Sequence, residues 1–182
     1  FYTKGVLGLL WLVQLPVEGH GLRISEPVLT DTVVYVSSDV SRTRRPVSIE
    51  YLAGAKLVLS EARWRDDDPM RRSLTARAQQ AGVLVDPFVE VEFQSAAMEL
   101  AASGVADTLV SYLVARSHER ANQVSWVSLD PPFEEQFAFV TKVNGVLSPA
   151  TKQFMVLAHR HIAALQETAS TWRQEYAPAR EE

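Results

Sequence analysis

The pattern that most limits the fold of this chain runs from residue 47 onward, where short helical and strand patterns alternate. Helices are predicted at 47–54, 69–81, 94–104, 111–121 and 148–170. Strands are predicted at 6–15, 27–36, 56–60, 88–93, 105–110, 123–129 and 136–143. Such alternation is typical of a parallel sheet with helices on both faces. The sequence therefore predicts an α/β protein.

Capping residues set the expected helix ends. Ser48, Asp68 and Ser148 each precede a helical pattern and have the side chains preferred at an N-cap. Gly82 and Gly104 end two helices, because glycine readily adopts the left-handed conformation found there. The longest helix, 148–170, is expected to turn one apolar stripe inward, made of Phe154, Leu157, His161, Ile162 and Leu165.

Composition excludes several classes of function. The 182 residues contain no cysteine, so thiol catalysis, cysteine-ligated metal and disulfides are excluded. The net charge of −4 gives no general attraction to nucleic acid or anionic lipid. No apolar run reaches the ~20 residues that span a bilayer. The longest run, 5–17, is interpreted as containing a strand buried on both faces of a parallel sheet.

Polar side chains follow three of the predicted strands. In open α/β sheets, ligands bind where parallel strands end and the next helices begin. The residues at these junctions are Ser60, Glu61, Arg63, Trp64, Gln94, Ser95, Ser111 and Tyr112. If the three strands are neighbours, these groups meet and suit a small anionic molecule. The alternative is that Ser95 and Ser111 are simple N-caps, each stabilising its helix by about 1 kcal/mol.

Residue types that would indicate catalysis or metal binding are not arranged for it. His159 and His161 point about 200° apart on a helix, so they do not share a metal. The run Asp66-Asp67-Asp68 lacks the alternate spacing of a calcium loop. The sequence has no glycine-rich phosphate loop, no G-x-S-x-G elbow and no pairing of a nucleophile with a base. We expect no catalytic residue, no metal and no cofactor.

Several segments resemble one family in order and spacing. The segment PVSIEYLAGAKLVLS resembles the P-V-S-L-x-D-L-A-G-x-P-L-I-L segment of LysR-type transcriptional regulators. EFQSAAMELAASGVADTLVSYLV is similar to their x-S-x-x-x-L-x-x-L-V-A-A-G-L-G-V-A-L-L-P segment. GVLGLLWLVQLPVEGHGLRISEPVLTDTVVYVSS and LSPATKQFMVLAHRHI resemble the preceding strands and the closing helix. Two positions depart from the pattern: Gly8 replaces the usual Asp and Ser111 the usual proline.

The resemblance implies a cytoplasmic effector-binding domain with a periplasmic-binding-protein type II-like fold, and no enzyme activity. In that fold two Rossmann-like lobes are joined by two crossover strands. Carried over, lobe one comprises 1–25 and 143–170 and is incomplete at its N-terminus. The crossovers are 26–36 and 133–142, and lobe two is 37–132. The family's N-terminal helix-turn-helix domain is not in the sequence, which fits the acidic charge.

The resemblance also implies which residues meet a ligand. The expected ligand-binding residues are Gln14, Thr30, Ser60, Arg63, Trp64, Gln94, Ser95 and Tyr112. Of these, Arg63 is expected to pair an acidic effector, Ser60 and Ser95 to hydrogen-bond it, and Trp64 to pack on it. The implied partners are a small-molecule effector, a homo-oligomer (dimer or tetramer), and DNA only through the missing domain. No membrane partner is implied.

Three other functions are open on sequence alone. A solute-binding protein of a transporter shares the fold class and would carry a secretion signal. An enzyme on an α/β scaffold would show turnover of candidate acids. A dimerisation module without any ligand is the third.

Overall fold

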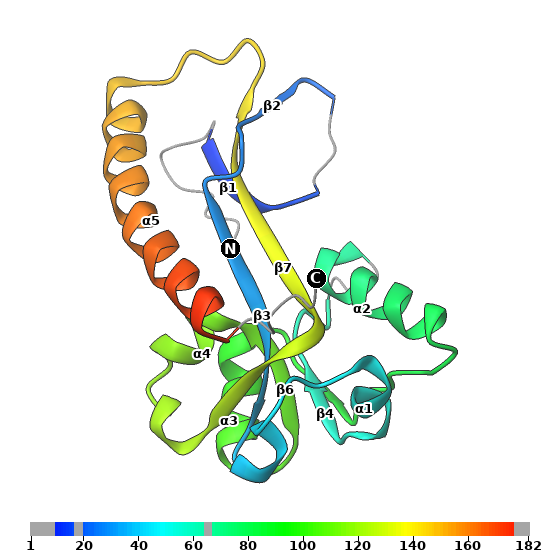
Figure 1. Cartoon of the computed structure of the whole chain (residues 1–182). Helices are drawn as coiled ribbons and strands as arrows, with labels where there is room; N and C mark the ends of the chain where they lie inside the picture. Colours follow the sequence, from blue (N-terminus) through cyan, green and yellow to red (C-terminus); the bar gives the residue numbers. More distant parts are fainter. Residues whose placement is uncertain (1–9, 17–19, 64–66, 177–182) are drawn as a thin grey trace. The chain divides into compact units, whose positions relative to one another are not determined.

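A computed structural model describes residues 10–16, 20–63 and 67–176 of the chain (Figure 1). The chain forms two compact units, which we describe one at a time. Unit 1 comprises 1–31 and 135–171, and unit 2 comprises 32–134 and 172–182. Two of the points where the chain passes from one unit to the other fall inside the predicted crossovers 26–36 and 133–142. The exact lobe boundaries stay a prediction.

The elements follow the predicted alternation closely. The strands are β1 (Leu10–Gln14), β2 (Leu22–Ile24), β3 (Leu29–Ser37), β4 (Leu57–Leu59), β5 (Val89–Glu90), β6 (Asp107–Ser111) and β7 (Ser125–Lys142). The helices are α1 (Ile49–Gly54), α2 (Pro69–Gln80), α3 (Gln94–Ala102), α4 (Tyr112–Ser117) and α5 (Pro149–Tyr176), with short 3-10 turns η1 (Val40–Thr43) and η3 (Ala121–Gln123). Two predicted strands, 123–129 and 136–143, form the single long strand β7.

Unit 2 is built on a sheet whose central strands are parallel. β4 pairs in parallel with β5 on one side and with β6 on the other. β3 pairs antiparallel with β6, so the sheet is mixed rather than wholly parallel. Because parallel strands finish at the same edge, the residues that follow β4, β5 and β6 come together there.

Alternation along β4 divides the core of unit 2 into two layers. Val58 packs in a cluster with Ala97 and Met98 of α3. Its neighbours Leu57 and Leu59 pack in a second cluster, which includes residues of α2. All three β4 side chains are buried. Successive strand residues face opposite sides of a sheet, so this short strand holds a helix on each face.

Unit 1 differs from the prediction in two respects. The described part of the first strand, β1, pairs antiparallel with β7, and Leu12 is 44% exposed, so the prediction of a parallel strand buried on both faces is wrong. On α5, Ile162 is buried, but the predicted inward residues Phe154 and Leu157 are about half exposed and His161 is exposed. The unit covers only one side of the apolar stripe.

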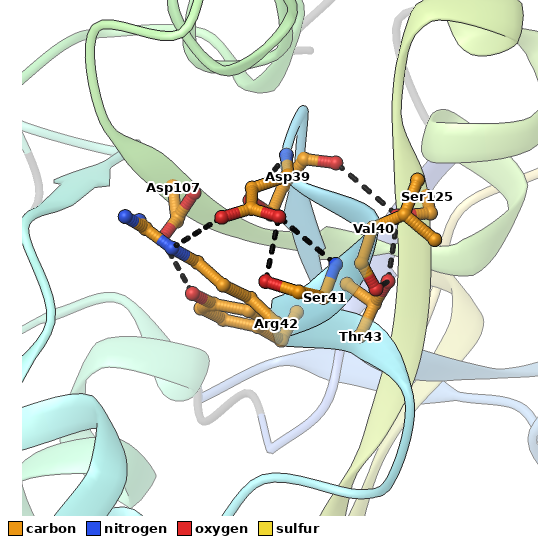
Figure 2. Close-up of polar contacts among 9 residues, drawn as sticks. Asp39, Val40, Ser41, Arg42, Thr43, Asp107 and Ser125 are labelled. Atoms are coloured by element: carbon orange, nitrogen blue, oxygen red, sulfur yellow. Dashed lines mark hydrogen bonds and ion pairs between the residues drawn. The ribbon is translucent and has the colours of Figure 1, made fainter.

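A polar cluster holds η1 against the sheet of unit 2 (Figure 2). Asp107, at the start of β6, is 4% exposed. It accepts a hydrogen bond from the Tyr35 hydroxyl and a charged one from Arg42 Nη1 at 2.7 Å. Burial and the hydrogen bond to Asp107 raise the pKa of Tyr35 far above its ordinary value, so Tyr35 acts as a donor at any physiological pH.

The Arg42–Asp107 pair is expected to stabilise unit 2. Arg42→Ala leaves a buried carboxylate with one fewer charged donor, and we expect a loss of about 1 kcal/mol or more in the free energy of unfolding. Arg45, exposed in the same segment, provides the matched control as Arg45→Ala. Urea unfolding of both variants measures the difference. Equal midpoints for the two variants would contradict this role for Arg42.

Candidate functional site

The carboxyl ends of β4, β5 and β6 bring four of the predicted polar residues to one edge of unit 2. Ser60 follows β4 directly. Gln94 and Ser95 open α3, which follows β5. Ser111 is the last residue of β6. Parallel pairing of β4 with both neighbouring strands places these junctions side by side.

Ser60 is fully buried, yet its hydroxyl has no hydrogen-bond partner among the described residues. By strand alternation it shares the face of Val58, which packs against α3. The hydroxyl is therefore directed to the side of the sheet that α3 covers. A buried polar group without a partner costs free energy, commonly about 1–3 kcal/mol, so such a group calls for a partner such as a water, an ion or a ligand.

The start of α3 has unused hydrogen-bond donors. Its N-cap is Phe93, which has no side chain able to cap the helix. The Ala96 and Ala97 N–H groups donate to the Phe93 carbonyl, at 3.1 and 3.2 Å. No described residue accepts from the N–H groups of Gln94 or Ser95. The helix thus directs two free donors and the positive end of its dipole to this edge.

Neither Ser95 nor Ser111 caps its helix through a side-chain hydrogen bond. Ser95 lies inside the first turn of α3 and is exposed. Ser111 stands at the N-cap of α4, but its side chain makes no capping hydrogen bond. The N-cap interpretation is therefore wrong for Ser95, while Ser111 holds the N-cap position without a capping bond from its side chain.

Gln94 joins two of the junctions. Its Oε1 accepts a hydrogen bond from the Ser111 N–H at 3.1 Å. This contact fixes the orientation of the amide and leaves Nε2, which can only donate, free of any described partner. With Ser60 Oγ and the α3 amides, the edge offers a set of donors. Such a set is complementary to an acceptor, such as a carboxylate or phosphate oxygen.

Arg71 contributes to the site although the sequence analysis did not identify it. Its Nη1 donates to the Ser60 carbonyl at 3.1 Å, and its Nη2 pairs with Glu90 Oε1 at 2.6 Å. The Arg71 side chain is 12% exposed. It therefore fixes the Ser60 peptide from the α2 side. Its partner Glu90 lies 19 residues away in the chain, so no local pattern in the sequence indicates this contact.

Arg63, the residue predicted to pair with an acidic ligand, is not among the residues that meet at this edge through the strand ends. Arg63 is exposed, and its backbone N–H donates to Glu92 Oε2 at 3.2 Å. Trp64 lies outside the described residues. The ligand roles of both residues stay predictions.

Three further predicted residues are engaged elsewhere. In unit 1, Gln14 Nε2 donates to Glu135 at 2.9 Å, and Gln166 accepts from the Thr30 N–H at 2.7 Å. In unit 2, the Tyr112 ring is 7% exposed and stacks on Trp172 with ring centroids 4.6 Å apart. These contacts give structural roles to all three, and their ligand roles stay predictions.

Carboxylates surround the residue that follows Ser60. Glu61 has φ of 61°, a left-handed conformation that is uncommon for a residue with a side chain. Burial is the main cause that raises the pKa of Glu61 above its ordinary value, and the nearby Asp68 and Glu92 carboxylates raise it further. Burial also raises the pKa of Asp68, which caps α2 by accepting from the Arg71 N–H at 2.8 Å. Glu61 is thus a source of electrostatic strain beside the donor edge.

Known proteins share this fold and its sequence signature. The family model described as the LysR substrate binding domain matches residues 10–163. No curated protein is significantly similar to the chain in sequence. None of the helices in the described part of the chain has an apolar stretch long enough to cross a membrane.

Solved structures of transcription regulators resemble the chain at low sequence identity. The regulatory domain of CcmR from Synechocystis PCC6803, in complex with 2-PG, has a TM-score of 0.68 at 17% identity, covering 86% of this chain and 73% of that one. The effector binding domain of QuiR in complex with shikimate gives 0.66 at 14%, covering 85% and 72%. Full-length CbnR, complexed with its target DNA, gives 0.65 at 14%, covering 85% and 52%.

The class of protein is therefore an α/β domain of the periplasmic-binding-protein type II-like kind, as predicted. The chain belongs to the LysR substrate binding domain family, which confirms the resemblance noted in its sequence. It spans about half of the length of full-length CbnR, at 52%.

Replacing Glu61 tests the electrostatics of the site. When the folded state raises the pKa of a carboxyl, the free energy of unfolding of the protein falls as pH rises through that pKa. Glu61→Gln should therefore melt at a higher temperature than the natural protein at pH 7. The difference should vanish below the ordinary pKa of 4.5, where the carboxyl is protonated in both states.

Thermal melts at the two pH values measure this effect, with Glu119→Gln, an exposed glutamate, as the control. A Glu61→Gln protein that is less stable than the natural one at pH 7, or an equal difference at both pH values, would show that Glu61 is not strained.

Proposed function

We propose that this domain is the ligand-sensing part of a LysR-type transcription regulator and binds a small molecule through an acceptor group, such as a carboxylate. The observation that carries the proposal is the buried Ser60 hydroxyl, which has no hydrogen-bond partner among the described residues. It faces the helix whose first two N–H groups have no described acceptor either. A ligand oxygen at this edge would satisfy Ser60 and the α3 amides together.

Each group has a distinct part in the proposed binding. The α3 amides and dipole stabilise negative charge at the helix start, by about 0.3–1 kcal/mol for a surface charge and more where water is excluded. The Ser60 hydroxyl donates a directional bond from the strand end. Gln94 Nε2 donates a further bond, held in place by the contact of Oε1 with Ser111. Arg71 holds the Ser60 peptide.

Binding, rather than chemistry, is the proposed activity. The described part of the site presents donors without a nucleophile held next to a base, which is the arrangement that covalent catalysis requires. No group of three or more metal-ligating side chains occurs among the described residues. We therefore propose that the domain performs no catalysis and uses no cofactor.

The proposed regulatory output follows from family membership. CcmR and QuiR domains of this fold were solved with 2-PG and shikimate, and CbnR with target DNA. By analogy, ligand binding would shift an equilibrium between conformations of a cytoplasmic homo-oligomer. DNA would be contacted through a separate N-terminal helix-turn-helix domain. Family membership gives no support to the alternative of a transporter's solute-binding protein.

Thermal-shift screening against small carboxylates and phosphorylated acids, shikimate among them, tests the proposal. A ligand at 100 times its Kd should stabilise the folded state by about 2.7 kcal/mol and raise the melting temperature. Ser60→Ala should raise the Kd of the hit by about 10- to 100-fold, because one hydrogen bond to a charged group is worth roughly 1.5–3 kcal/mol.

Gln94→Glu makes a sharper variant. A glutamate at this position still accepts from the Ser111 N–H, but it replaces the donor Nε2 by a charged acceptor that repels an anion. In Gln94→Glu, the rise in melting temperature caused by the ligand should disappear. Gln153→Glu, the same change at an exposed position of α5, is the matched control and should keep it. A screen without any hit, or a hit that survives both Ser60→Ala and Gln94→Glu, would refute the proposed site.

A further inference from the structure

Helix α2 makes a buried contact with the proposed site at its first turn. Arg71 donates to the Ser60 carbonyl and pairs with Glu90 of β5, and the Arg71 N–H is held by Asp68 at the N-cap. The guanidinium thus fixes α2 to the ends of two neighbouring strands. Any displacement of the Ser60 peptide must change the geometry of this contact.

The last turn of the same helix is fixed to β7. Arg77 Nη1 donates to the Pro131 carbonyl at 2.6 Å, and Nη2 donates to the Pro132 carbonyl at 2.9 Å. The guanidinium carbon lies 5.0 Å from the centre of the Phe133 ring. Arg77 therefore binds two successive backbone carbonyls of β7 with one guanidinium.

Between its two contacts, α2 is a well-anchored helix. Met70, Leu74 and Ala78 are buried beneath it. Met70 and Leu74 belong to the core cluster that contains Leu57 and Leu59 of β4. Arg71 and Arg77 are six residues apart, about 9 Å along the helix axis. A short, packed helix of this kind moves as one body rather than bending between its ends.

We propose that α2 couples the occupancy of the site at Ser60 to the segment of β7 around Pro131–Pro132. That segment leads directly to the point after Glu134 where β7 leaves unit 2. A ligand held by the Ser60 hydroxyl changes the position of the Ser60 peptide, Arg71 transmits the change to α2, and Arg77 carries it to β7. Arg77 is in this sense a positioning residue for the regulatory response.

The inference rests on the proposed function for its purpose, but the coupling itself is a property of unit 2 without ligand. Energetic coupling is reciprocal. If α2 couples its two ends, a substitution at either end therefore changes the stability of the contacts at the other. A test on the ligand-free protein therefore does not depend on whether the site binds a ligand. A negative result would refute the coupling through α2 and would leave the proposed ligand site standing.

Hydrogen exchange measured by mass spectrometry on the ligand-free protein tests the coupling. Arg71→Ala should speed amide exchange severalfold at 57–62, where its contact is lost, and also at 133–137. Arg77→Ala should speed exchange at 133–137 and at 57–62. In the double variant, the effects at 133–137 should be smaller than the product of the single effects, because both act through one helix.

Control variants separate coupling from general destabilisation. Arg72→Ala, an exposed change on the same helix, should leave both segments as in the natural protein. Arg77→Lys keeps the charge but not the two-pronged donation, and should behave as Arg77→Ala. Should Arg71→Ala fail to fold, Glu90→Gln weakens the same contact more gently and should give the same two-segment pattern.

Two results would overturn the proposal. In the first, the single variants change exchange only at their own end of α2. In the second, the double variant shows the full product of the two single effects at 133–137, which would mean that the ends of the helix act independently.

Discussion

Parallel pairing of β4 with β5 and β6 is the constraint on which the proposed site depends. Each of these strands is short, and β4 has only three residues. Their shared direction nevertheless places Ser60, the start of α3 and the end of β6 at one edge. An antiparallel arrangement of the same segments would send their ends to opposite edges. The hydrogen-bond register of the sheet, rather than any single side chain, assembles the donors.

The site gains its character from groups left unsatisfied by the fold. Ser60 is buried without a partner in the described part of the chain, and the N-cap residue of α3, Phe93, has no side chain able to cap the helix. Both features cost stability in the free protein, and a ligand oxygen bound at this edge would offset both costs. Glu61, in a left-handed conformation beside other carboxylates, adds a third cost at the same strand end. Stability and recognition are therefore opposed at this edge.

The sequence predicted the order of elements because each has a local signal. Ser48, Asp68 and Ser148 do accept hydrogen bonds from backbone N–H groups three residues later, as their residue types indicate. The alternative that Ser95 caps α3 is wrong because the helix begins one residue earlier, at Gln94. Helix propensities do not locate a helix boundary to within one residue. Pro131 and Pro132 suggested a break in β7, which continues through them.

Contacts between distant residues had no local signal. The bond of Gln94 to the Ser111 N–H joins residues 17 apart, and it exists only because neighbouring strands are parallel. Nothing in the local sequence around Arg71 and Arg77 indicates that both guanidinium groups reach backbone carbonyls. On α5, the apolar pattern identified a helix face but not which part of it packs, so Ile162 is buried while Phe154 and Leu157 are not.

Amide NMR of the protein titrated with a small carboxylate, shikimate or acetate, tests the central claim most directly. If the start of α3 receives the acceptor, the Gln94 and Ser95 N–H resonances should show the largest shifts, in the downfield direction of a newly formed hydrogen bond. The same titration should leave them in place in Gln94→Glu. Saturating shifts centred on other residues, with Gln94 and Ser95 unmoved, would contradict the account.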